Sequence, residues 1–102
     1  MLSKTRRRPS PTLQEFPAYF RTLSDSARLE ILELLAGSKD LTVGDLARQL
    51  DISQPLCSWH IRRLVKLGIV RMKRVGREAR CSLDRDRLQE YQRAFKTWLA
   101  LH

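Results

Sequence analysis

Apolar residues along this chain recur mostly at the spacing of a helix and, in one short region, at the alternating spacing of strands. Helical spacing predicts five helices, which begin near residues suited to cap a helix N-terminus: Thr12, Asp25, Thr42, Ser53 and Asp84. Leu23, Gly37 and Gly68 are expected to close the first, second and fourth helices. The short turn at residues 51–52 separates the third helix from the fourth.

Between the fourth and fifth helices, the pattern changes to that of a β-hairpin. Two strands are expected over Ile69–Val75 and Glu78–Leu83, joined at Gly76-Arg77, where a leading glycine suits a type II′ turn. The fold class is therefore mainly α with a small β-hairpin. A short helix, a turn, a longer helix and a two-stranded hairpin follow one another in the order of a winged helix-turn-helix.

The first 11 residues differ from the rest, because an arginine run is followed by Pro9, Ser10 and Pro11. This composition predicts a disordered basic arm over residues 1–11, and residues 12–102 are expected to form one domain. Pro17 either starts or bends the first helix. A chain of 102 residues has room for one modest core, which disfavours a multi-domain enzyme.

Basic residues are concentrated in two parts of the chain, whose formal net charge is +9. Residues 58–80 contain eight lysines and arginines and one acid, and residues 1–12 contain four basic residues and no acid. Residues 13–57, in contrast, contain four basic and seven acidic residues. A polyanion, with nucleic acid first and an anionic membrane second, is thus the expected partner of the fourth helix and the hairpin.

No run of residues has the length of a membrane span and no signal peptide is visible, so a cytoplasmic protein without a membrane role is expected. The fifth helix has more apolar surface than a chain-end helix covers by itself, which predicts contact with a second copy. No nucleophile-base set, glycine-rich phosphate loop or zinc motif is recognisable, so the chain is not expected to be an enzyme.

Several segments resemble the ArsR family of small dimeric repressors. They are Phe20-Arg-Thr-Leu-Ser-Asp-Ser-Ala-Arg-Leu-Glu-Ile-Leu-Glu-Leu-Leu, Leu41-Thr-Val-Gly-Asp-Leu-Ala, Ser53-Gln-Pro-Leu-Cys-Ser-Trp-His-Ile-Arg-Arg-Leu, Leu67-Gly-Ile-Val and Gly76-Arg. The resemblance implies a transcriptional repressor that binds double-stranded DNA at an inverted-repeat operator and is released by an effector. It also implies a homodimer whose first and last helices form the interface, with these candidate residues: Phe16, Tyr19, Phe20, Leu88, Tyr91, Phe95, Trp98 and Leu99.

Candidate DNA contacts follow from the major groove, where short polar side chains at the start of a recognition helix reach base edges. From the fourth helix these are Ser53, Gln54, Ser58, Trp59, His60, Arg62 and Arg63. From the hairpin, or wing, Lys73, Arg74, Arg77 and Arg80 are expected to contact phosphate or the minor groove. Ser53 is equally suited to a plain helix cap, and His60 to a structural hydrogen bond. The alternative function is a winged-helix module for non-specific DNA coating or protein contacts.

The signal to which the protein responds is the least defined part. Family members often bind metal through a Cys-x-Cys pair, but Thr42 and Gly44 occupy these positions here, so no family-type metal site and no cofactor are expected. Cys57 and Cys81 remain as a candidate redox pair that would link the recognition helix to the wing. Their simpler interpretation is as small buried hydrophobes. A small effector stays unidentified.

Overall fold

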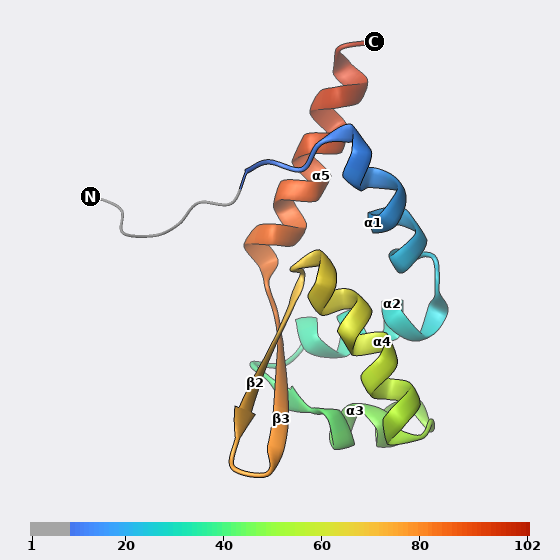
Figure 1. Cartoon of the computed structure of the whole chain (residues 1–102), viewed down its shortest axis with the longest axis vertical. Coiled ribbons are helices and arrows are strands. Elements are labelled where there is room, and N and C mark those ends of the chain that lie inside the picture. Colours follow the sequence, from blue (N-terminus) through green and yellow to red (C-terminus); the bar gives the residue numbers. More distant parts are fainter. Residues whose placement is uncertain (1–8) are drawn as a thin grey trace, which may run out of the picture.

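The computed structural model describes residues 9–102 and consists of five α-helices and a small antiparallel sheet, which lies at one side of the molecule (Figure 1). The order is η1 (Leu13–Glu15, a 3-10 turn), α1 (Phe16–Leu23), α2 (Ser26–Ala36), β1 (Leu41–Thr42), α3 (Val43–Leu50), α4 (Gln54–Leu67), β2 (Val70–Val75), β3 (Glu78–Leu83) and α5 (Arg85–Ala100). The mainly α winged fold expected from the sequence is confirmed.

Capping side chains fix the helix starts where the sequence predicts them. The Asp25 carboxylate accepts hydrogen bonds from the backbone N–H groups of the first turn of α2, and Thr42 and Asp45 form a reciprocal capping box on α3. Ser53 and Asp84 cap α4 and α5 in the same way. Each such cap satisfies N–H groups that have no partner inside the helix and contributes about 1 kcal/mol.

The sheet has three strands rather than the two expected, in the order β1-β3-β2. Leu41 and Thr42 pair with Cys81 and Arg80 of β3, and a strand of two residues is too short to show an alternating pattern. At the hairpin tip, Gly76 has φ 63° and Arg77 has no positive φ, as a type II′ turn requires.

One core joins the helices to the sheet, and its centre contains side chains that are fully buried. They come from α2, α3, α4 and the base of the wing: Ile31, Leu35, Leu46, Cys57, Ile61, Leu64, Ile69, Val70 and Cys81. Burial of each large aliphatic side chain contributes about 1.5–3 kcal/mol. In Figure 1 the wing and α3 lie at one end of the molecule, and α5 extends to the other.

Asp84 connects the wing to α5 without an intervening loop. Its backbone N–H donates to the Ile69 carbonyl at 2.8 Å, and its carboxylate accepts from Arg71 of β2 at 3.2 Å and from the Arg87 backbone at 3.0 Å. The side chain of Arg87 then donates to the Pro9 carbonyl at 3.1 Å. The hairpin and α5 are therefore held together where they meet.

The segment before η1 packs against the domain, which corrects one boundary of the sequence prediction. Pro11 is buried and the Pro9 carbonyl is hydrogen-bonded to Arg87, so the expected disordered arm does not extend to residue 11. The arginine run, at residues 6–8, lies outside the described residues.

Candidate nucleic-acid interface

Helix α4 is anchored by one face, and its N-terminal turn is exposed. Cys57, Ile61 and Leu64 are fully buried, whereas Gln54 and Arg62 on other faces are exposed. Ser53 accepts a hydrogen bond from the Leu56 N–H at 3.2 Å, so the cap role expected for it is present, and its backbone also begins the exposed turn. The buried stripe fixes the orientation of the helix, which lets its first turn present polar groups to a ligand.

A groove of about 440 Å³ runs between this turn, α3 and the wing. Its lining includes Gln54 and Ser58 from α4 together with Arg74 and Arg77 from the wing. The structure thus brings together four of the residues predicted from the sequence. Two hydrogen-bonding side chains beside two cations match what base edges and phosphates require of a protein.

Sequence reasoning assigned no DNA-related role to Gly44, which lies on the α3 side of this groove. A Cβ atom at Gly44 would lie 3.2 Å from Nε2 of Gln54, closer than most such contacts. The absence of a side chain at Gly44 is therefore what allows the Gln54 amide to lie against α3. Only the three-dimensional contact between α3 and α4 reveals this relation, because the two residues are ten positions apart.

The cations of the wing divide into paired and unpaired groups. Arg80 contacts Asp40 at 2.7 Å and Glu78 at 2.9 Å, and the hydrogen bond with Asp40 raises its pKa. Within residues 9–102, Lys73, Arg74 and Arg77 make no ion pair. The Arg80 guanidinium, expected to bind DNA, is thus already occupied by two carboxylates.

His60 also departs from the expected DNA surface. Its side chain is 6% exposed, and its Nδ1 accepts a hydrogen bond of 3.0 Å from Arg28, because a guanidinium can only donate. Burial lowers the pKa of His60, and the positive charges of Arg28 and Arg63 act in the same direction against the opposing effect of Asp25. The structural hydrogen bond considered for His60 is therefore the arrangement present.

Trp59 and Arg63 lie on a side of α4 away from the groove. The guanidinium carbon of Arg63 is 4.4 Å from the centroid of the Trp59 ring, and the indole is 42% exposed. Both residues line a second hollow, bounded by α1, α2 and α5. Arg62 borders a shallower hollow with the same two residues.

The two cysteines lie in the core, and both thiols are free and fully buried. Burial raises the pKa of Cys57, and burial together with the charge of a Cys57 thiolate raises the pKa of Cys81 to about 11. A thiol reacts as its thiolate. These environments favour the interpretation of both residues as small buried hydrophobes over a redox pair.

The aromatic residues of α1 and α5 form one cluster. Tyr19 and Tyr91 stack with their ring centroids 4.3 Å apart and are buried within the chain, as is Phe16. Phe20 and Leu99 remain 42% and 52% exposed. Three of the predicted interface residues are therefore already covered by their own chain, while the half-buried and exposed members remain available: Phe20, Leu88, Phe95, Trp98 and Leu99.

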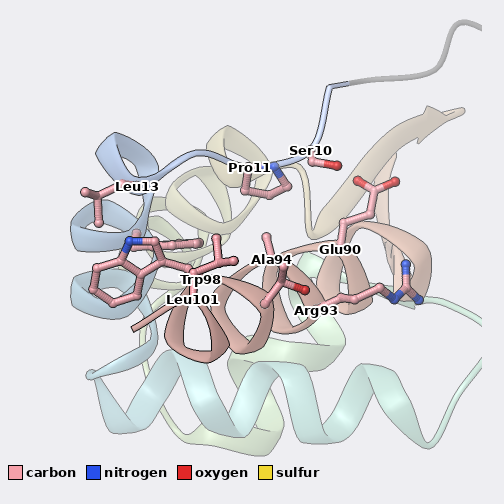
Figure 2. Close-up of a pocket in the computed structure, with 10 residues that line it drawn as sticks. Ser10, Pro11, Leu13, Glu90, Arg93, Ala94, Trp98 and Leu101 are labelled. Carbon is pink, nitrogen blue, oxygen red and sulfur yellow. The ribbon is translucent and has the colours of Figure 1, made fainter.

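A hollow of about 360 Å³ lies beside this cluster, between the N-terminal segment and α5. Figure 2 shows Leu13 and Trp98 toward one end of it and Glu90 and Arg93 toward the other, with Pro11 above. In the described part of the chain, no cluster of three or more histidines, cysteines or carboxylates could hold a metal ion. No helix among residues 9–102 is both long and apolar enough to cross a bilayer.

Comparison with known proteins places the chain in a family. The model of the "bacterial regulatory protein, arsR family" matches residues 25–72. The transcriptional repressor SdpR of Bacillus subtilis (strain 168) is 37% identical over 71 residues, which are 70% of this chain and 78% of that protein. A homolog of the cadmium resistance transcriptional regulatory protein CadC from Staphylococcus aureus is 32% identical over 71 residues, 70% of this chain but 59% of that protein.

Solved structures support the same family assignment. An ArsR-like transcriptional regulator from Rhodococcus sp. RHA1 superposes with a TM-score of 0.75 at 31% identity, over 85% of this chain and 81% of that one. The transcriptional repressor BigR from Xylella fastidiosa gives a TM-score of 0.63 at 26% identity, over 87% and 88%. With the winged fold, these likenesses show that the chain belongs to the ArsR family and is a DNA-binding transcription regulator rather than an enzyme.

Proposed function

We propose that this protein represses transcription in the bacterial cytoplasm by binding an inverted-repeat operator as a homodimer, and that a small effector releases it. The observation that carries the DNA-binding half of the proposal is the groove between α3, α4 and the wing. There Gln54 and Ser58 supply hydrogen bonds to base edges, and Arg74 and Arg77 supply charge for phosphates. Lys73 of the wing and Arg62 of α4 do not line the groove, but both are exposed and would add charge for phosphates beside it.

The homodimer is supported by the exposed part of the aromatic cluster on α1 and α5. A monomer would leave Phe20 and Leu99 in water beside the half-buried Phe95 and Trp98. A second copy would cover them by a symmetric contact, as most soluble oligomers do. Two copies related by a two-fold axis would present two α4 helices with the same symmetry. The matching DNA site is therefore an inverted repeat.

Selection of bound fragments from random and genomic DNA at physiological salt tests this function. We expect enrichment of one inverted repeat whose half-sites are about 10 base pairs, or a multiple of that, apart. Specific sites are usually bound at least about 10³-fold more tightly than random DNA. Equal affinity for the selected and random fragments would favour a non-specific coating module and contradict the proposal.

A further inference from the structure

A cavity of about 780 Å³ lies on the side of α4 away from the DNA-binding groove. Helix α4 contributes Trp59, Arg63 and Lys66, α1 contributes Arg21, and α2 contributes Arg28. Tyr91 of α5 closes another part of the wall. The cavity therefore touches the recognition helix and both helices of the proposed dimer interface.

The cavity carries positive charge that is not paired by carboxylates within residues 9–102. Four cations line it, namely Arg21, Arg28, Arg63 and Lys66, and none of them makes an ion pair with any residue in the range 9–102. Glu15 is the one acidic lining residue, and it faces Arg87 at 3.6 Å. Asp25 attracts Arg28 but is engaged as the cap of α2. Such a cavity favours an anion.

An aromatic surface lies among these charges. The guanidinium carbons of Arg63 and Arg28 are 4.4 Å and 5.6 Å from the centroid of the Trp59 ring. Arg28 is 8% exposed and is fixed by hydrogen bonds to the Thr22 carbonyl at 2.7 Å and to His60 at 3.0 Å. Guanidinium and indole planes both stack on flat rings. The cavity thus has one cation fixed by two hydrogen bonds, three further cations and an aromatic side.

We propose that this cavity binds an aromatic organic anion, with its ring against Trp59 and its carboxylate among the arginines. The volume suits a molecule larger than one phosphate group, since ligand sites span about 300–1,000 Å³. Trp59 and Arg63 do not line the DNA-binding groove, but they are exposed on the same helix as Gln54 and are predicted DNA contacts, so the occupant competes with the operator for these two side chains. This coupling to DNA rests on the proposed repressor function, whereas binding in the cavity does not.

Calorimetry of the full chain without DNA tests the site, with 2-naphthoate as the probe and 2-naphthamide as its uncharged counterpart. We expect saturable binding of naphthoate at one site per chain, and binding of the amide about tenfold weaker because it lacks the charged hydrogen bonds. Arg63→Gln is expected to weaken naphthoate binding to a similar degree. The matched variant Lys73→Gln, which removes an exposed cation of the wing, should leave the affinity unchanged.

Absence of saturable binding at millimolar naphthoate would overturn the site, and so would equal losses in Arg63→Gln and Lys73→Gln, which would indicate general charge attraction. In that case the cations of the cavity would instead bind phosphates of the DNA backbone. Circular dichroism checks that the two variants remain folded, as expected for substitutions at exposed positions. A protein that binds naphthoate but shows no sequence-specific DNA binding would refute the repressor function and retain the site.

Fluorescence anisotropy with labelled operator DNA tests the competition. Naphthoate is expected to release the DNA from the wild-type protein in proportion to its occupancy of the cavity, and naphthamide is expected to release little. Saturation of the cavity with no change in operator affinity would overturn the competition.

Discussion

The end of the molecule that carries α3, α4 and the wing differs from the end formed by α1 and α5 in what each exposes. At the first end polar and cationic side chains such as Gln54 and Arg77 are exposed, with a few apolar ones such as Met72 among them, above a buried base that includes Ile61 and Leu64. At the second end apolar side chains such as Phe20 and Leu99 are exposed among polar ones, and Phe20 belongs to the aromatic cluster. In the proposed homodimer, the first surface is complete in one chain, whereas the second is completed by the other copy.

The difference separates two kinds of recognition. Contacts with DNA depend on charge and on hydrogen bonds, so they weaken with salt and are divided among many small contributions. Contact between copies depends on the removal of apolar surface from water, so a single introduced charge disrupts it.

The largest effect is expected from Leu99→Glu, which places a carboxylate in the proposed interface between copies. We expect the dimer to weaken by at least about 100-fold, or about 3 kcal/mol, because the charge loses its hydration without gaining a partner. Sedimentation equilibrium measures this change. Leu29→Glu is a matched control, since Leu29 is 48% exposed but lies on α2. Dissociation of both variants alike, or of neither, would contradict the interface.

Replacement of Gln54 by alanine is expected to have the next largest effect. Loss of a bidentate contact with one base costs about 1–3 kcal/mol at the preferred operator and relaxes the preference at that position. Arg77→Gln should instead weaken all DNA sequences alike. Binding measured on the operator and on its single-base variants separates the two roles. If both substitutions change specificity in the same way, the division between base and phosphate contacts is wrong.

A smaller effect is expected on the pH dependence of folding stability, through the titration of His60. Because burial lowers the pKa of His60 in the folded state, the unfolded chain takes up this proton first, and stability falls as pH decreases below about 6.5. Above that pH, the contribution is fully present. Asp25 and Asp45, whose pKa values are lowered, act only at more acidic pH, near about 4 and below.

The variant His60→Asn tests this expectation, because its side-chain oxygen can accept the hydrogen bond of Arg28 but does not titrate. Urea unfolding between about pH 7.5 and pH 5.5 should show a smaller loss of stability in the variant than in the wild-type protein. Identical slopes would mean that His60 is protonated without cost, and that it belongs to the exposed surface after all.

The smallest effect is expected from Arg80→Gln. The ion pairs with Asp40 and Glu78 already occupy this guanidinium, so operator affinity should change by less than about twofold. Salt titration gives the sharper comparison, since Arg77→Gln should reduce the dependence of log affinity on log salt by about one unit. A similar reduction in Arg80→Gln would show that Arg80 leaves its carboxylates for DNA.

The positions of the helices could be predicted from the sequence because local chemistry determines them. Asp25, Ser53 and Asp84 cap helices through atoms two or three residues away, and Gly68 ends α4 with a positive φ. Both partners of each such contact lie within a few residues of each other. The local sequence is therefore sufficient to predict where these helices begin and end.

Contacts between residues far apart in the sequence could not be predicted from it. Arg80 pairs with Asp40, forty positions away, and no property of the wing sequence indicates this. Tyr19 and Tyr91 were predicted to meet a second copy, but they meet each other. Helical spacing identifies an apolar face without saying which surface covers it. For the same reason the relation between Gly44 and Gln54 appears only in the folded chain.

The contact at Asp84 has a mechanical consequence. Strand β3 leads directly into α5, and one aspartate bonds to β2, the strand end and the helix start, so a movement of the start of α5 is passed to the hairpin. In the proposed dimer, the angle at which the two α5 helices cross would determine the distance between the two hairpins. A few degrees of change at that crossing would shift both hairpins along the duplex, out of phase with a fixed operator.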